Sequence, residues 1–243
     1  MGKENIRMSE EYDDTAWLGA GYAEDFDAVV LANGDFPVHP IALRVLHSAR
    51  YLICCDAAAE GVLDRTGKMP DAVVGDGDSL PQAIKVSLGD TYHEFEEQDY
   101  NDLTKATRFF TLLSQEAGYQ NSPLRSHDKP LRMAYLGATG KREDHTLGNI
   151  SLLSFYKESF GINPVMFTDN GVFTAHNGDD TITTVAGQQI SIFNIGCRKM
   201  SSEGLKWAAR PFEEWWMGTL NEALSNSMTI HADGRYLVFR KYM

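Results

Sequence analysis

The strongest constraint on the fold is a regular alternation of apolar runs and helix-like segments between residues 26 and 171. The apolar runs carry almost no charge and end in Gly, Asn or Asp, and the segments between them place apolar residues at helical spacing. This alternation predicts βα units joined into a parallel sheet. Uncharged strands agree with that prediction, because helices cover both faces of a parallel sheet.

The expected elements follow from these patterns and from the residues that punctuate them. Pro40 suits the first turn of a helix, and Gly67 and Gly118 suit helix ends. We expect strands at 26–34, 51–56, 71–79, 91–99, 132–140 and 163–171, and helices at 39–50, 57–68, 101–118 and 144–161.

The pattern changes after residue 171, where short alternating segments and turn pairs replace the helices. The stretch "MTIHADGRYLVFRK" (228–241) predicts a hairpin around Asp233-Gly234. Segment 211–224 has the pattern of one helical turn or more. We therefore expect a polar extension (1–23), a parallel-sheet α/β domain (24–170) and a small C-terminal all-β domain (171–243).

Composition narrows the possible partners. The chain has 243 residues, a formal net charge of −12 and a pI of about 5.0. Binders of nucleic acid or anionic membranes are usually basic, so neither is expected as a partner. There is no signal-like N-terminus and no apolar run of 18 residues, so we expect no membrane span. The three cysteines form no C-x-x-C pair, which disfavours a zinc site and favours the reducing cytoplasm.

Two acids follow the third expected strand, in "VVGDGDS" (73–79). Asp76 and Asp78 lie two residues apart in a glycine turn, where both carboxylates can converge on one Mg²⁺. The alternative interpretation is a solvated turn without a ligand.

A second acidic cluster opens the helix that begins near residue 101. Asp99 and Asp102 are three residues apart and can share a face, and Lys105 lies one turn further, where it can hold a phosphate. The alternative is simple capping, with Asp99 as N-cap and Asp102 in the first turn.

A third cluster is "LGATGKREDHTLGN" (136–149), a glycine turn between a strand and a helix. Its backbone N–H groups can cradle phosphate, and Lys141 and Arg142 add positive charge. Asp144, His145 and Asn149 occupy the first turns of the helix. The sequence is not a Walker A loop, and the alternative is a tight turn with an Asp cap and a surface histidine.

All three clusters lie at carboxyl ends of expected strands, together with Asn33, Asp56, Ser79 and Thr139. Ligands bind at that edge in open α/β sheets. Acids for a metal and a basic glycine loop for phosphates together predict metal-assisted phosphoryl-group chemistry.

These segments resemble the signatures of a known enzyme family. "GDGDS", "DYNDLTKA" and "GATGKREDHTLGN", in this order, are similar to the G-D-x-D-S, D-x-x-D-x-x-K-A and G-x-x-G-x-R-x-D-H-x-x-x-N motifs of thiamine pyrophosphokinases. "SSEGLKW" (201–207) and "GTLNE" (218–222) resemble the T-x-G-L-K-W/Y and G-x-S-N-E stretches of that family's C-terminal domain. The resemblance covers residues 26–243.

The resemblance implies a homodimer that transfers pyrophosphate from ATP to the thiamine hydroxyl, giving thiamine diphosphate and AMP. It implies a C-terminal β-sandwich, and an active site between the α/β domain of one subunit and the β-domain of the other.

The family's site residues carry over by motif. The catalytic residues would be Asp76, Asp78, Asp99 and Asp102, with Mg²⁺ on Asp76, Asp78 and Asp102. Arg142, Asp144 and Asn149 would line the nucleotide and phosphate site, and we expect Asn33, Asp56, Ser79, Lys105, Thr139 and His145 to contribute to it as well. Thiamine would contact Ser202, Trp207 and Asn221, with Trp207 as an aromatic platform for a flat cation.

Some positions depart from the family pattern, namely Ala57, Ala58, Gly77, Asn101 and Leu220. Leu220 stands where the family has Ser and removes one possible thiamine contact. Several alternatives stay open: a pyrophosphokinase for another alcohol such as a hydroxymethylpterin, a D-x-D glycosyltransferase, or a non-catalytic binding module. Trp207 has its own alternative, packing in the core of the β-domain.

Overall fold

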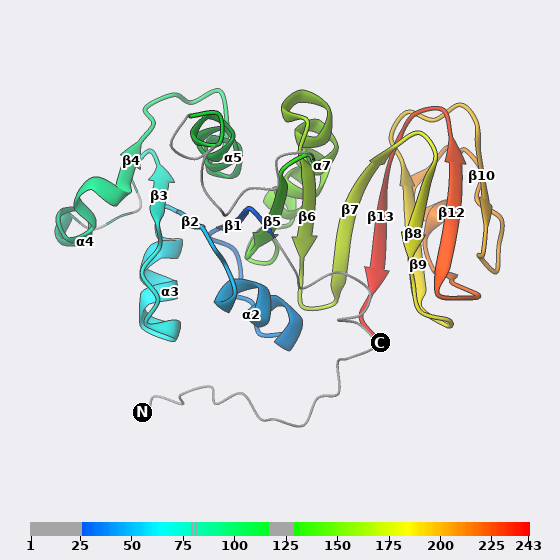
Figure 1. Ribbon diagram of the computed structural model, residues 1–243, viewed down its shortest axis with the longest axis horizontal. Coiled ribbons are helices and arrows are strands. Elements are labelled where there is room, and N and C mark those ends of the chain that lie inside the picture. Colours follow the sequence, from blue (N-terminus) through cyan, green and yellow to red (C-terminus); the bar gives the residue numbers. More distant parts are fainter. Residues whose placement is uncertain (1–25, 79, 81, 117–128) are drawn as a thin grey trace.

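The computed structural model of the chain describes residues 26–78, 80, 82–116 and 129–243 (Figure 1). The predicted extension 1–23 and Ser79 lie outside the described residues. The elements of the first half are β1 (Ala28–Leu31), α2 (Pro40–His47), β2 (Leu52–Cys55), α3 (Ala58–Thr66), β3 (Ala72–Gly75), α4 (Gln82–Leu88), η1 (Gly89–Thr91), β4 (Tyr92–Glu94), α5 (Asp102–Leu113), β5 (Arg132–Leu136), α7 (Glu143–Phe160) and β6 (Asn163–Phe167).

The second half consists almost entirely of strands. Its elements are β7 (Gly171–Asn177), β8 (Asp180–Thr183), β9 (Gln189–Asn194), β10 (Met200–Glu203), η2 (Trp215–Gly218), β11 (Asn221–Glu222), β12 (Ser227–Ala232) and β13 (Arg235–Lys241). Among the described residues, no helix has the length and apolarity needed to cross a bilayer.

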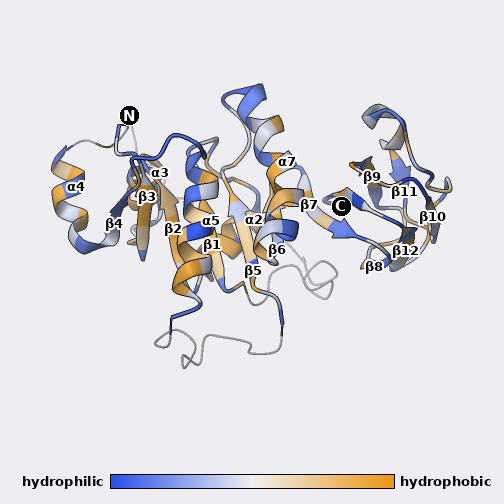
Figure 2. Ribbon diagram, turned by 90° about the horizontal axis from the view of Figure 1, so that it is seen from above, coloured by the Kyte–Doolittle hydropathy of each residue, from blue (hydrophilic) through white to orange (hydrophobic). Residues whose placement is uncertain are grey.

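Six neighbouring strands, in the order β6-β5-β1-β2-β3-β4, are all parallel, which confirms the predicted sheet. Successive residues of each strand point to opposite faces of the sheet. Val29 and Leu31 pack in one core with α2 and α3, whereas Ala28 and Val30 pack in a second core with α5 and α7. Figure 2 shows the hydrophobic residues concentrated in these strands and on the helix faces against them.

The sheet continues into the second half of the chain. β7 pairs antiparallel with β6, and β13, β9 and β11 extend it to ten strands. A separate antiparallel sheet, β10-β12-β8, faces this extension across a third core that includes Ile190, Ile192, Met228, Ile230 and Val238. The α/β part and the β-sandwich therefore form the two ends of the molecule (Figure 1), as the predicted fold class requires.

The predicted hairpin at Asp233-Gly234 is wrong. β12 and β13 lie in different sheets and do not pair with each other. Both strands point alternate apolar residues into the same core, so the turn carries the chain from one sheet to the other. The Asp233 carboxylate stabilises the crossing by accepting hydrogen bonds from the backbone N–H groups of Arg198 and Lys199, both at 2.8 Å.

Helix boundaries agree with the prediction in part. Pro40 begins α2, and Gly67, with φ +67°, ends α3. Helix α5 ends at Leu113, before the predicted Gly118, which lies outside the described residues. The helix α4 was not predicted, and segment 211–224 contains one 3₁₀ turn, η2.

Candidate active site

A pocket of about 570 Å³ lies at the carboxyl ends of β1 and β5. The two strands are neighbours, but the chain runs from β1 towards β2 and from β5 towards β6, on opposite sides. Open α/β sheets bind ligands at such a switch point. Eight predicted site residues line the pocket: Asn33, Asp76, Asp99, Asp102, Lys105, Arg142, His145 and Asn149. The fold thus brings together four segments that are far apart in the sequence.

Four other predicted residues do not line this pocket: Asp56, Asp78, Thr139 and Asp144. Ser79 lies outside the described residues.

Two turns pack tightly at the switch point. The backbone N–H of Gly34 donates to the carbonyl of Gly137 at 2.7 Å, and that of Asp35 donates to the carbonyl of Thr139 at 2.9 Å. A Cβ atom at Gly34 would collide with both carbonyl oxygens. Glycine is therefore required here for close backbone approach, and Thr139 contributes through its carbonyl.

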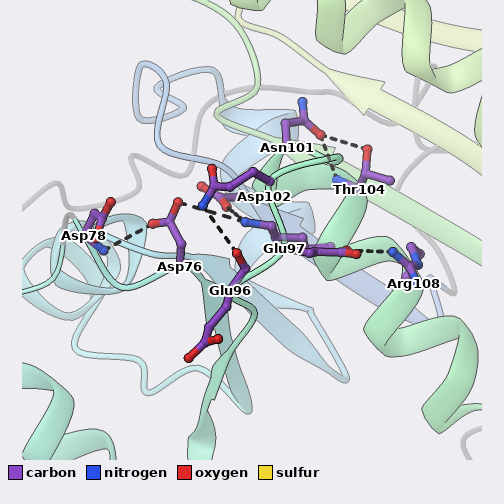
Figure 3. Close-up of polar contacts among 10 residues, drawn as sticks. Asp76, Asp78, Glu96, Glu97, Asn101, Asp102, Thr104 and Arg108 are labelled. Carbon is purple, nitrogen blue, oxygen red and sulfur yellow. Dashed lines mark hydrogen bonds and ion pairs between the residues drawn. The ribbon is translucent and has the colours of Figure 1, made fainter.

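Figure 3 shows Asp76 between Asp78 and Asp102. Asp76 follows β3 and Asp102 begins α5, and their carboxylates lie 4.0 and 3.4 Å from Nζ of Lys105. The Lys105 side chain is only 2% exposed. Asp78 is exposed, and its backbone N–H donates to Oδ1 of Asp76 at 3.2 Å. The structure therefore turns Asp76 and Asp102 towards a common cation, with Asp78 further out.

Asp56 lies at the end of β2, buried, with φ +41°. Among the described residues its Oδ1 has no hydrogen-bond partner. Burial, followed by the negative charges of Asp102 and Asp76, raises the Asp56 pKa to about 6. Burial also raises the pKa of Asp102, while the backbone N–H of Asp78 lowers that of Asp76. Three carboxylates, those of Asp56, Asp76 and Asp102, therefore lie around a single lysine, Lys105.

The donor set bears on the predicted Mg²⁺. Within the described ranges, no three His, Cys, Asp or Glu side chains gather closely enough to form a ready metal centre. Mg²⁺ usually takes one or two carboxylates and completes its shell with waters and substrate phosphates. Asp76 and Asp102 already converge on one cation, and Asp56 has an unpartnered oxygen. These residues fit Mg²⁺ that arrives with a nucleotide.

Helix α7 carries the third cluster. Arg142 precedes the helix and pairs with Asp144 through two hydrogen bonds, at 3.1 and 2.6 Å, which lower the Asp144 pKa. Asp144 therefore orients Arg142, which lines the pocket. Asn149 donates to the carbonyl of Ala138 at 2.8 Å and accepts from Nδ2 of Asn101 at 3.1 Å. It thus links the glycine turn to the start of α5.

The alternative that Asp99 caps α5 is wrong. Asn101 is the N-cap, and its Oδ1 accepts from the backbone N–H of Thr104 at 3.0 Å. Sequence reasoning did not name Gln98 and Tyr100, which also line the pocket; Gln98 precedes the "DYNDLTKA" motif and Tyr100 is an unspecified position within it. Lys141 lines it too. The sequence identified it as a positive charge of the glycine loop, although not among the nucleotide contacts.

The β-domain contains a second pocket, of about 390 Å³, lined by Trp207, Ala208, Arg210, Phe212, Met217, Gly218, Thr219, Leu220 and Asn221. Trp207 is 55% exposed, so it does not pack in the core as the alternative interpretation required. Nζ of Lys206 lies 5.0 Å from the centre of its ring.

Two predicted thiamine residues act on the backbone around Trp207. Asn221 accepts from the Trp207 N–H at 3.2 Å and donates to the Trp207 carbonyl at 2.7 Å. Ser202 does not line the pocket, and its Oγ accepts from the N–H of Ala209 at 2.8 Å. Both side chains therefore hold the loop that presents the indole.

A pocket with carboxylates and a cationic glycine loop, at the switch point of a parallel sheet joined to a β-sandwich, defines a two-domain phosphoryl-group transferase. The sequence matches the family model described as "Thiamin pyrophosphokinase, catalytic domain" over residues 42–163, and the "substrate-binding domain" model over 171–239. The chain belongs to the thiamin pyrophosphokinase family and is an enzyme of that family.

Individual relatives agree. Thiamine pyrophosphokinase 1 of Oryza sativa subsp. japonica is 29% identical over 205 residues, which cover 74% of this chain and 72% of that protein. Thiamin pyrophosphokinase from Candida albicans is similar in structure, with a TM-score of 0.72 at 18% identity, covering 92% of this chain and 91% of the other. Yeast thiamin pyrophosphokinase is also similar in structure, with a TM-score of 0.72 at 17% sequence identity, and the match covers 90% of this chain and 87% of the yeast chain. These two structures share the fold of this chain.

Proposed function

We propose that this enzyme transfers the pyrophosphoryl group of ATP, with Mg²⁺, to the hydroxyl of thiamine, giving thiamine diphosphate and AMP. The observation that carries the proposal is the convergence of carboxylates, a buried lysine and a glycine loop in one pocket. A volume of about 570 Å³ lies in the range of small-molecule and cofactor sites. Family membership supports thiamine as the acceptor.

In this proposal the chain positions the reactants and stabilises charge. The bond from the thiamine oxygen to the β-phosphorus forms as the bond between the β-phosphorus and the α,β-bridging oxygen breaks, and AMP leaves. Lys105, Arg142 and the glycine-loop N–H groups hold phosphate oxygens. Asp99 lines the pocket and accepts the hydroxyl proton. Asp76 and Asp102 would hold Mg²⁺, which neutralises phosphate charge when bound.

Trp207 supplies the acceptor platform. Thiamine is a flat cation, and an exposed indole attracts it by stacking and cation–π interaction. The nucleotide pocket and the Trp207 pocket share no lining residue within one chain. We therefore propose a homodimer in which the β-domain of one subunit completes the site of the other, with light scattering as its check.

The first test is an endpoint reaction with ATP, Mg²⁺ and thiamine, analysed by mass spectrometry. Thiamine diphosphate and AMP that disappear with EDTA are the expected products. ADP in place of AMP would contradict direct pyrophosphoryl transfer. Thiamine binding without product would indicate a binding module, and product only with a hydroxymethylpterin would indicate another acceptor.

The cytoplasm remains the proposed compartment. Cys54, Cys55 and Cys197 are all buried thiols without disulfides. Reduced, buried cysteines of this kind are typical of reducing compartments.

A further inference from the structure

Lys141 has an unusual backbone conformation in the glycine loop. Its φ is +54°, directly after Gly140 at +79°. Residues with a Cβ atom avoid this region, and such outliers concentrate at functional sites. Among the described residues, only Asp56 and Leu220 share this property without being glycine. Leu220 lines the second pocket, and Asp56 lies beside the acids that line the first.

The Lys141 side chain connects the two turns of the switch point. Its Nζ donates to the backbone carbonyl of Asn33 at 2.9 Å and to Oδ1 of Asn33 at 3.0 Å. Both residues line the nucleotide pocket, and Lys141 is exposed. The ammonium group therefore lies at the pocket and remains accessible to a ligand.

The cations of the pocket differ in their partners. Lys105 is ion-paired with Asp102 and Asp76, and Arg142 is ion-paired with Asp144. Lys141 forms no ion pair with any described carboxylate, and both of its hydrogen-bond acceptors are uncharged. Of the pocket's three described Lys and Arg residues, it is the one whose charge no adjacent carboxylate compensates.

We propose that Lys141 is a further nucleotide-binding residue, whose ammonium donates to a phosphate oxygen of the incoming nucleotide. The inference rests on the proposed function in taking a nucleoside triphosphate as co-substrate. Exposed hydrogen bonds to neutral oxygens contribute little net free energy, so exchanging one for a charged phosphate oxygen is favourable. Glycine would adopt the same φ without strain but would provide no ammonium group.

The test compares K141M, K141R and K141G with the wild type by calorimetric titration of inorganic tripolyphosphate and of ATP. Losing a hydrogen bond to a charged group should weaken both affinities about 10- to 100-fold in K141M and K141G. K141R should stay within severalfold of the wild type, and the KM for thiamine should not change. K141G should melt no lower than the wild type, because glycine relieves the positive φ.

Lys68 offers a matched control. Its Nζ also donates to backbone carbonyls, those of Leu46, His47 and Ala49, but at the opposite edge of the sheet. K68M should lower the melting temperature and leave tripolyphosphate affinity unchanged.

Wild-type affinity for tripolyphosphate in K141M would overturn the proposal. An equal loss in K141M and K141R, with a lowered melting temperature in both, would also overturn it and assign Lys141 to loop structure. If the wild type binds tripolyphosphate but makes no thiamine diphosphate, the proposed function fails. Weaker binding in K141M would still support the role of Lys141.

Discussion

Replacing Asp56 with Asn should stabilise the protein at neutral pH. The Asp56 carboxyl is buried beside Asp76 and Asp102, and its pKa rises from 3.8 to about 6. Two pKa units correspond to at most about 3 kcal/mol of native-state destabilisation in the ionised form. We therefore expect D56N to gain about 1 to 3 kcal/mol in unfolding free energy at pH 7.

The pH dependence of this gain shows whether the ionised Asp56 carboxyl is its cause. Below about pH 3 the wild-type carboxyl is largely protonated in both the folded and the unfolded state, so D56N should show no gain in unfolding free energy. Between pH 4 and 6 the unfolded state loses its proton first, so wild-type stability falls relative to D56N. Above about pH 7, where the carboxyl is ionised in both states, the gain should be constant.

Urea unfolding from about pH 3 to 8 measures this difference, with D64N as the control because Asp64 is exposed on α3. D64N should follow the wild type at every pH. A D56N protein less stable than the wild type at pH 7, or a gain independent of pH, would refute the electrostatic explanation. Turnover should fall in D56N, since the oxygen proposed for a metal or phosphate shell is lost.

Three further variants test separate parts of the site. N221A removes hydrogen bonds that hold the Trp207 backbone, so we expect a loss of about 1 to 3 kcal/mol in urea unfolding and a higher KM for thiamine. An unchanged KM would contradict the positioning role. D76N should reduce turnover more than D78N at saturating Mg²⁺, since only Asp76 lines the pocket; the reverse order would assign the metal to Asp78. G34A should destabilise by about 1 to 3 kcal/mol, through collision with two carbonyl oxygens, and wild-type stability would show that the turns can separate.

Much of the pocket at the switch point was predictable from the sequence. Parallel strands place their carboxyl ends at one edge, so acids and glycines after successive strands had to be neighbours. Asp76 and Asn33 follow β3 and β1 and line one pocket, as this rule requires. The rule determines which strand ends meet, but it does not determine the direction of each side chain. Asp78 is exposed and does not line the pocket.

The β-domain was harder to predict because its contacts join residues far apart in the sequence. Asn221 and Trp207 are 14 positions apart, and no local sequence pattern shows that the side-chain amide of Asn221 forms its hydrogen bonds with the Trp207 backbone. The hairpin predicted at Asp233-Gly234 was wrong for a related reason. An alternating pattern shows which residues face a core, but it does not show whether two strands pair or face each other across that core.

The start of α5 shows why a capping interpretation and a catalytic one need not compete. A helix N-terminus favours acids whether or not they bind a ligand, so the sequence alone could not separate the two. In the structure Asn101 supplies the cap, and its own N–H₂ group donates to Asn149 across the pocket. Asp102 lies in the first turn of α5, as the capping interpretation required, and its Oδ1 also accepts a hydrogen bond from Nζ of Lys105 at 3.4 Å. Asn101 therefore joins the start of α5 to Asn149, and we expect an N101A variant to lose turnover under conditions in which α5 is still folded.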